Sequence, residues 1–555
     1  MSTSEPASGE RSHGWLGWLL LGVGLFGAAF LLPVNVKSLN TALLREAGRG
    51  TPAVSGLGRN LLELDKPGPA VLVLEAANAV GDTGAAALKV VFDDYALRHP
   101  DMMTLGGGDR ALVPLLQGEG RGGDGKSRPV LTLLAQQRER ENLRAYLSVS
   151  RLPGVQALLK TADLTTTTRF VPARRPGGQP LDAVILLSAY LWQGGNLAAP
   201  LQREVRALAE AAVTSGHMGE LEDFYLDILT LGKRLDWVQL SELLLTATST
   251  GTVGQFAHLA RVAPEHLPVT YTAALMTRSA DLVARYLIAF GQPGAENLRL
   301  ALSHGQGAIK QLVEQQAPVS TAPGPEFEMG AGFALRHPDL ALFLKYAAFL
   351  AGAFLLLRAV DLRFFRLIET TLRSGFPRMG SGILALILTF IFFVFSEPYL
   401  LKAAPVSDYQ IKLVIPLLGD AATAAAATTP STNNTTMSNS TILSVVVFAV
   451  IQVVMYVICL LKISEVDRQT LPVSTKLKLM ENEENLFDGG LYIGIAGTAT
   501  ALVLQVLGLI EANLLAAYSS NLFGIVCVAL VKIRHVRPYK RKLILDLPVP
   551  AAVTA

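Results

Sequence analysis

The sequence predicts an all-α integral membrane protein with six transmembrane helices and a large, mainly α-helical exported domain between the first and the second. Only 17% of the 555 residues are charged, against about 25% in a typical soluble protein. Half of the residues are apolar, and six stretches offer close to the roughly 20 apolar residues that a helix needs to cross a bilayer. This composition excludes a disordered chain and argues against a purely soluble enzyme.

The charge balance and the two cysteines exclude further partners and sites. The 48 basic and 45 acidic residues nearly cancel, and the only dense basic cluster lies at the extreme C-terminus, so nucleic acid is not an expected partner. The two cysteines, Cys459 and Cys527, lie inside apolar stretches. They allow neither a disulfide framework nor a CxxC metal site. We expect no cofactor and no metal.

The first predicted span, residues 15–34, follows a short N-terminus, residues 1–14. We interpret it as an uncleaved signal anchor, because its apolar core exceeds the roughly 7–15 residues of a cleaved signal peptide and no clear A-x-A site follows. Cleavage is the alternative. The other spans are predicted at residues 340–357, 382–401, 441–461, 489–510 and 512–531.

Three charged residues lie near the ends of these spans: Lys345, Glu397 and Glu511. An ionisable group inside the membrane is costly and often functional, but near a span end water is close. We therefore predict that all three are interfacial anchors. No span carries an acidic residue at mid-depth, so a proton pathway would need a carboxylate from another source.

Lysine and arginine in the short loops predict the orientation, because they are enriched on the cytoplasmic side. Residues 358–381 hold five arginines, residues 462–488 hold four basic residues, and the tail 532–555 holds six. The loop 402–440 holds only two and is rich in Ala, Thr, Ser and Asn, which predicts a flexible outer loop. The predicted location is the inner (cell) membrane, with both termini cytoplasmic and residues 35–339 periplasmic or extracellular.

The exported domain, residues 35–339, shows mainly helical periodicity. Short β-like runs, such as those at 70–74 and 168–171, are too few for a sheet-based fold. The hexapeptide ALRHPD occurs at 96–101 and at 334–339, which we interpret as coincidental helix ends, and no regular repeat supports a solenoid. The clearest helical patterns are at residues 129–148, 200–212, 221–231, 238–248 and 280–290.

Residues 120–127 (GRGGDGKS) fit the phosphate-binding pattern G-x-x-x-x-G-K-[ST]. A phosphate loop needs a buried strand before the first glycine and a helix that starts at the lysine. Here a polar LQGE segment precedes the pattern, Arg128 and Pro129 interrupt the helix start, and the predicted orientation places the segment away from ATP. We therefore interpret it as a glycine-rich loop.

The exported domain offers no recognisable catalytic pattern. There is no HExxH, no other histidine pair at i, i+4 with acids nearby, and no GxSxG nucleophile motif. We predict no catalytic residue, no metal site and no enzymatic activity. The histidines of residues 35–339 are His99, His217, His258, His266, His304 and His337.

Small and polar residues follow one face of each of the last two spans. In the fifth span, Gly494, Thr498 and Gln505 are spaced at i, i+4 and i+11, with Gly490 completing a GxxxG step. In the sixth span, Ser520 and Gly524 continue the same pattern. Two interpretations stay open: close helix packing, or the lining of a narrow wet path.

The sequence of this hairpin, residues 489–531, resembles the MotA/TolQ/ExbB proton-channel family. Gly494-Ile-Ala-Gly497-Thr498 is similar to the family's G-L-L-G-T signature, and residues 518–525 (YSSNLFGI) are similar to its next signature. The resemblance implies a homo-oligomer whose hairpins line a pore around a single-span partner with a membrane aspartate. It maps Thr498, Ser520 and Asn521 to pore hydroxyl positions. The pore-lining or packing candidates are Gly494, Gly497, Thr498, Gln505, Ser520, Asn521 and Gly524.

Two functional hypotheses lead. The first is a non-enzymatic, oligomeric inner-membrane component, namely a proton-channel or energy-transducing, stator-like subunit whose exported domain engages envelope proteins. The alternative is a membrane-anchored scaffold or assembly subunit that presents a helical binding domain and conducts nothing. A third and weaker hypothesis is an enzyme with an unrecognised active site in residues 35–339.

Overall fold

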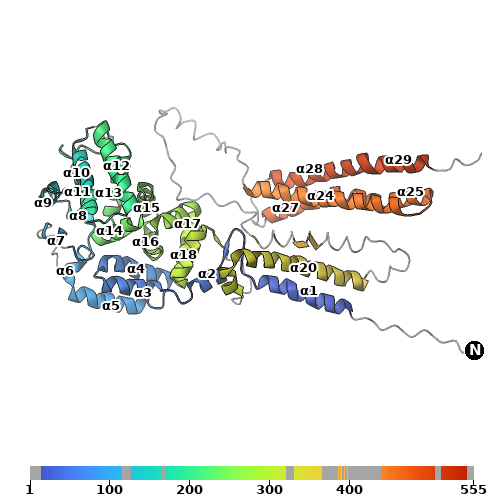
Figure 1. Ribbon diagram of the computed structural model, residues 1–555, viewed down its shortest axis with the longest axis horizontal. Helices are drawn as coiled ribbons and strands as arrows, with labels where there is room; N and C mark the ends of the chain where they lie inside the picture. The colour runs from blue at the N-terminus through green and yellow to red at the C-terminus, as the bar shows by residue number, and fades with distance from the viewer. Residues whose placement is uncertain are drawn as a thin grey trace, which may run out of the picture. The chain divides into compact units, whose positions relative to one another are not determined.

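The computed structural model of the chain is mostly α-helical, which confirms the all-α class (Figure 1). It describes residues 14–109, 111–115, 127–165, 169–320, 330–364, 439–506 and 514–546, and the single positions 385, 386, 388, 389, 393 and 397. The chain divides into two units. Unit 1 comprises residues 1–38, 322–404 and 416–555, and unit 2 comprises residues 39–321 and 405–415.

Unit 1 contains the predicted membrane spans. Its helices pack as two groups: α1 with α20, and α24 with α27 and α28 (Figure 1). The described elements are α1 (Gly14–Phe30), α19 (Ala331–Arg336), α20 (Pro338–Phe364), α24 (Asn439–Arg468), α25 (Val473–Asn482), α26 (Glu484–Phe487), α27 (Gly489–Val506), α28 (Leu514–Ala529), the π-helix η6 (Leu530–Val536) and α29 (Arg537–Leu545).

Several of these helices differ in length from the predicted spans. The first, α1, ends at Phe30, four residues before the predicted end, whereas α20 and α24 continue past their predicted ends to Phe364 and Arg468. Most of the third predicted span and the whole of the predicted flexible loop up to residue 438 lie outside the described residues. Within the described part, one stretch, Pro338–Val360, is both long and apolar enough to cross a membrane, and Trp15–Phe30 is a shorter apolar helix.

The last helices form one continuous rod from Leu514 to Leu545, because η6 joins α28 to α29 without a break. In η6 the buried residues Val531 and Val536 are five positions apart, which is the spacing that a π-helical hydrogen bond joins. His535 is four positions after Val531, where an α-helix would place the next residue of the buried face. Its Nε2 lies 2.7 Å from the Tyr456 hydroxyl of α24. The first part of the predicted basic tail is therefore helical and packed.

Unit 2 is an array of packed helices with one minimal sheet. The strands β1 (Leu39–Asn40) and β2 (Val319–Ser320) pair in parallel, with Leu39 opposite Val319. The helices are α2 (Thr41–Gly48), α3 (Val54–Glu63), α4 (Pro67–Val80), α5 (Ala85–Arg98), α6 (Pro100–Met103), α7 (Leu112–Leu115), α8 (Val130–Leu133), α9 (Gln137–Ser148), α10 (Pro153–Lys160), η2 (Thr161–Asp163), α11 (Gln179–Gln193), α12 (Ala199–Ser215), α13 (Glu220–Gly232), α14 (Trp237–Thr246), α15 (Thr250–Val262), η3 (Pro264–His266), α16 (Leu267–Thr277), α17 (Ala280–His304) and α18 (Gln306–Gln315).

Most of the predicted helices of unit 2 are present. α12, α13 and α14 match their predicted ranges closely, whereas the predicted helix 129–148 is wrong as a single element, because it is divided into α8 and α9. α17 passes through a kink at Gly291, which has φ +57° and ψ −139°. The β-like run 70–74 is wrong, because these residues form part of α4 and are largely buried there. Of the run 168–171, the described residues form no strand.

Both copies of ALRHPD are helix junctions. In each, a helix ends at the arginine, the histidine leaves the helical region, and proline starts the next helix: His99 has φ −128° and ψ 57°, and His337 has φ −136° and ψ 69°. The cause is general, because proline disfavours the α-conformation of the residue before it and is well suited to the first helical position. The repeat is therefore a shared local signal at two helix junctions.

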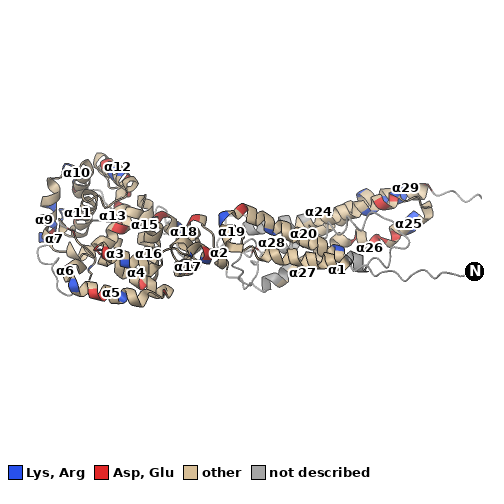
Figure 2. Ribbon diagram, turned by 60° about the horizontal axis from the view of Figure 1, so that its bottom comes forward, with Lys and Arg blue, Asp and Glu red and all other residues tan. Residues whose placement is uncertain are grey.

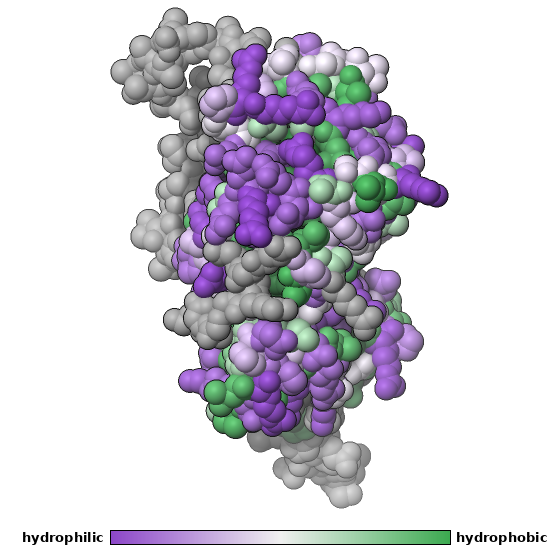
Figure 3. Space-filling view, turned by 90° about the vertical axis from the view of Figure 1, so that its left-hand side faces the viewer, coloured by the Kyte–Doolittle hydropathy of each residue, from purple (hydrophilic) through white to green (hydrophobic). Residues whose placement is uncertain are grey.

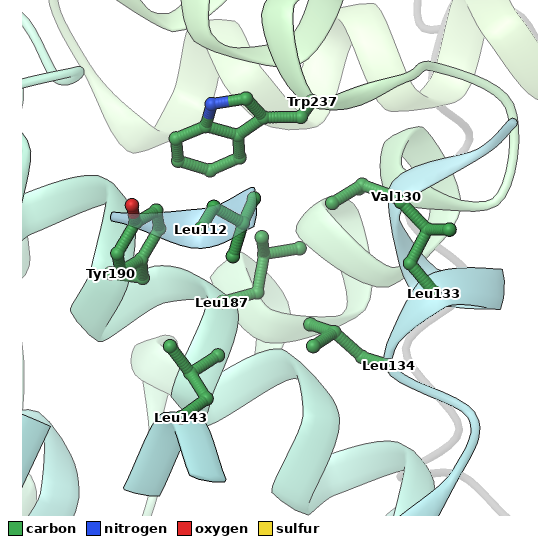
Figure 4. A pocket seen from close by; sticks show the side chains of 8 residues that line it. All are labelled: Leu112, Val130, Leu133, Leu134, Leu143, Leu187, Tyr190 and Trp237. Carbon is green, nitrogen blue, oxygen red and sulfur yellow. The ribbon is translucent and has the colours of Figure 1, made fainter. Parts of the chain in front are cut away.

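The interior of unit 2 is tightly packed. One apolar cavity, of about 10 Å³, is lined by Leu, Val, Tyr and Trp side chains that come from α7, α8, α9, α11 and α14 or directly follow them (Figure 4). A cavity of this size holds at most one water molecule, so it offers no room for an organic ligand. On the face shown in Figure 3, hydrophilic residues dominate the described surface, with hydrophobic residues scattered among them.

Candidate functional site

The predicted site begins with the contact between α27 and α28, whose backbones touch. A Cβ atom added to Gly524 would lie 2.5 Å from the carbonyl oxygen of Gly490, and one added to Gly494 would lie 3.0 Å from the carbonyl oxygen of Ser520. A larger residue at Gly524 would collide with the backbone of Gly490, and one at Gly494 would press against the backbone of Ser520. The structure therefore brings together the small residues that the sequence places on one face of each helix.

The two predicted pore hydroxyls point to one backbone oxygen. Thr498 Oγ1 donates a hydrogen bond of 3.0 Å to the carbonyl of Gly494, and Ser520 Oγ donates one of 3.3 Å to the same oxygen. Ser520 is buried, and its Oγ lies 2.3 Å from the position that a Cβ would take at Gly497. These hydroxyls are thus engaged at the helix contact.

A third helix, α24, also contributes to this site, and none of its residues is among the candidates predicted from the sequence. Gln452 is only 5% exposed, and its Nε2 donates a hydrogen bond of 3.0 Å to the carbonyl of Gly490. Cys527 of α28 donates through Sγ to the Gln452 carbonyl at 3.6 Å. The signal in the sequence is an amide, Gln452, that stands alone in the apolar run 445–455, because an amide inside a predicted membrane helix needs a partner.

Two buried amide oxygens of this three-helix site have no hydrogen-bond partner in the described part of the chain: Gln452 Oε1 and Asn521 Oδ1. Burying an unpaired polar atom is costly. The cost favours a donor that reaches these oxygens, such as water or a group from another molecule. The side chain of Gln505, the remaining predicted candidate, lies outside the described residues.

The outward sides of the hairpin are largely apolar. Thr500, an exposed polar residue there, donates its hydroxyl to the carbonyl of Ala496 on its own helix at 2.8 Å. The large exposed hydrophobic residues of α27 and α28 are Tyr492, Ile495, Val503, Leu522, Ile525 and Val526. A face of this kind suits lipid or an apolar neighbour.

A second polar site lies where α1, α20 and residue 397 meet. Lys345 of α20 is 5% exposed, and its ammonium donates to the Val34 carbonyl and, at 3.1 Å, to Asn35 Oδ1. Glu397 is fully buried. Its carboxylate accepts hydrogen bonds from Val36 N–H at 2.7 Å and from Lys37 N–H at 3.4 Å.

The hydroxyl of Tyr346 also donates to Glu397, at 2.9 Å. We call this group the linker clamp: residues 34–37, Lys345, Tyr346 and Glu397. The interfacial position of Lys345 and Glu397 stays a prediction, but their side chains are buried in the protein and hold the backbone that follows α1. Glu511 lies outside the described residues.

The clamp rests on a close helix pair. A Cβ atom at Gly22 of α1 would lie 3.0 Å from the backbone nitrogen of Leu356, and one at Gly352 of α20 would lie 3.0 Å from the backbone nitrogen of Phe26. Phe349 then packs edge-on against Phe26, with ring centroids 5.0 Å apart. This contact fixes the height of Lys345 relative to the end of α1.

The glycine-rich segment of unit 2 lies outside the described residues except for Ser127, which has a structural partner. Ser127 Oγ donates a hydrogen bond of 2.6 Å to Asp236, the buried N-cap of α14, which also accepts from Gln239 N–H at 2.8 Å. Burial raises the pKa of the Asp236 carboxyl to about 7, although these hydrogen bonds lower it. The contact ties the end of the glycine-rich segment to α14.

Another carboxyl of unit 2, Asp227 of α13, has a pKa raised to about 7 by burial and by the nearby Asp223, against the opposing effect of Arg261. Perturbed carboxyls mark functional sites in some proteins and structural ones in others. In the part of the chain that the structure describes, no three His, Cys, Asp or Glu side chains are grouped so that they could hold a metal ion.

Compared with known proteins, the chain matches no family model, no curated protein and no solved structure. The resemblance of residues 489–531 to the MotA/TolQ/ExbB family therefore stays a prediction.

The helix contact leads to a direct stability prediction. We expect Gly524→Ala to destabilise the protein by about 1–3 kcal/mol, because the added methyl meets the backbone of Gly490 and neither helix backbone can yield cheaply. The measurement is unfolding of the full-length protein in mixed micelles, followed by circular dichroism. Gly24→Ala is the matched control, because a Cβ at Gly24 meets nothing within 4 Å. Equal stability of the two variants would contradict the close contact.

The linker clamp predicts coupling between its two charges. Lys345→Met leaves a buried carboxylate without its compensating charge, and Glu397→Gln leaves a buried ammonium, so each should destabilise by about 3 kcal/mol. The double variant should lose clearly less than the sum of the two. Lys542→Met, at an exposed cation, should change stability by less than about 0.5 kcal/mol. Additive losses in this double-mutant cycle would show that the two groups act separately.

Proposed function

We propose that the chain is a multi-pass inner-membrane protein in which α1, α20, α24, α27, α28 and residues 382–401 cross the bilayer. The distribution of charge supports this arrangement: Lys, Arg, Asp and Glu are frequent on the helices of unit 2 and again on α25, α26 and α29 (Figure 2). In contrast, α1, α27 and α28 contain none, and α20 contains none between Lys345 and Arg358. Both termini would lie in the cytoplasm, with unit 2 on the outer side.

Within this anchor, we infer that the protein is an assembly subunit, which presents unit 2 to envelope partners and conducts nothing. One observation carries the inference: the hydroxyls of Thr498 and Ser520 are bonded to the Gly494 carbonyl at the helix contact. The small residues are occupied by packing within one chain, and the outward faces are largely apolar. The assembly subunit, which is the alternative in the sequence analysis, therefore becomes the leading hypothesis.

The structure of unit 2 suits a presented binding domain. The paired strands β1 and β2 bring together the points where the chain enters and leaves the helical array. Exposed apolar side chains gather on α5, where Val90 is 69% and Leu97 is 83% exposed. Several large apolar residues on one exposed helix favour a protein contact there.

The test is purification of the intact complex from native membranes under mild conditions, with the mass and companions determined. We expect envelope proteins to accompany the full chain and to be lost from a Val90→Ser, Leu97→Ser variant. The matched control is Val149→Ser, Leu152→Ser, which removes exposed apolar groups elsewhere on unit 2. Companions that survive the α5 changes, or a five-fold oligomer around a single-span protein with a membrane aspartate, would contradict the assembly hypothesis.

The second candidate is the proton-conducting, energy-transducing subunit. One observation favours it, namely that Gln452 Oε1 and Asn521 Oδ1 have no hydrogen-bond partner among the described residues of the three-helix contact that also holds Thr498 and Ser520. A hydrated site there, completed by the carboxyl of a partner helix, could relay protons. Proton flux into liposomes that contain the purified complex distinguishes the candidates. Flux that Thr498→Val abolishes supports conduction, and flux at the level of empty liposomes supports the assembly subunit.

A further inference from the structure

We propose that the start of the basic segment after α28, Arg534 and Arg537 foremost, binds the phosphate groups of anionic phospholipids in the cytoplasmic leaflet. The proposal rests on the membrane anchorage proposed above. It goes beyond that anchorage because it assigns lipid binding to particular residues. The excess of basic residues in a loop predicts only the orientation of the protein.

One cation of this segment forms internal ion pairs, and those that follow it do not within the described part of the chain. Lys532 is paired, with its ammonium 2.7 Å from Asp488 and 4.0 Å from Glu484. The next cations have no ion-pair partner among the described residues, and all but the half-buried Lys540 are exposed. They are Arg534, Arg537, Lys540, Arg541 and Lys542. The patch therefore keeps its positive charge for another molecule.

The position of the apolar surface sets the depth of the two arginines. Exposed hydrophobic side chains continue through η6 to Ile533, which is 67% exposed, and Arg534 follows directly. With a rise of about 1.5 Å per residue, Arg537 lies about 6 Å beyond Ile533 and Arg541 about 12 Å. The headgroup layer of one leaflet is about 5–8 Å thick. Arg534 and Arg537 thus reach phosphate depth, while Arg541 and Lys542 extend beyond it.

The arginines are presented on a packed support. Val536 and Leu543 are buried against the neighbouring helices, and His535 is held by the hydroxyl of Tyr456 at 2.7 Å. A helix fixed in this way loses little conformational freedom when it binds a ligand. The guanidinium group matches phosphate geometry through two parallel hydrogen bonds. Exposed apolar residues directly beside the arginines favour a lipid over a nucleic acid, whose backbone offers them no apolar partner.

The test uses full-length protein in detergent and native mass spectrometry, with phosphatidylglycerol or phosphatidylcholine added at equal concentration. We expect retention of phosphatidylglycerol over phosphatidylcholine, decreasing as salt rises. The Arg534→Gln, Arg537→Gln variant should bind phosphatidylglycerol about 20–30-fold more weakly. The matched control is Arg468→Gln, Lys478→Gln, which removes two exposed cations that lie on α24 and α25. It should bind like the unchanged protein.

Each other result overturns the proposal. Equal retention of the two lipids, an equal loss in the control variant, or displacement of the lipid by millimolar inorganic phosphate would each exclude a specific lipid site. Tighter binding of a DNA duplex than of phosphatidylglycerol would assign the patch to nucleic acid. Failure of the membrane anchorage is a separate result, because the full chain would then stay in solution and monodisperse without detergent.

Discussion

In a bilayer, every polar group on a spanning helix must find its partner inside the protein, and we propose that this constraint organises unit 1. The backbone after α1 is irregular, so its carbonyl and N–H groups at residues 34–37 need partners. Lys345 supplies the donor and Glu397 the acceptor. The linker clamp therefore satisfies two buried charges and a non-helical segment together, and it fixes the chain just before β1 begins at Leu39.

The same constraint explains the glycine contacts. Between apolar helices the hydrophobic effect gives no preference for one another over lipid, so association depends on close packing and on interhelical hydrogen bonds. Gly22 with Gly352, and Gly490 with Gly524, allow backbones to touch in the two helix groups of unit 1. In the second group this approach brings the Ser520 hydroxyl and the Gln452 amide onto carbonyl oxygens of α27. The close packing of the helices and the hydrogen bonds of their buried polar groups therefore depend on the same glycines.

Much of this could be predicted from the sequence, for physical reasons. Periodicity placed α12, α13 and α14, and the stripe of Gly494, Ser520 and Gly524 predicted a helix contact that the structure contains. The inward turn of Lys345 and Glu397 could not be predicted, because their partners are backbone groups of a linker more than 300 residues earlier in the chain. The strand predicted at 70–74 is wrong, because this stretch of α4 is entirely apolar and largely buried, so it shows no helical period. Gln452 was overlooked, although its amide in an apolar run was a readable signal.

We propose that unit 2 is presented on one side of a membrane and the rod that ends in α29 on the other. Both native cysteines are buried, so single introduced cysteines can report sidedness with a membrane-impermeant maleimide in sealed right-side-out vesicles. The account predicts that Lys89→Cys in α5 is labelled in sealed vesicles and that Lys542→Cys in α29 is labelled only after detergent is added. Labelling of both positions in sealed vesicles, or protection of Lys89→Cys, would contradict it.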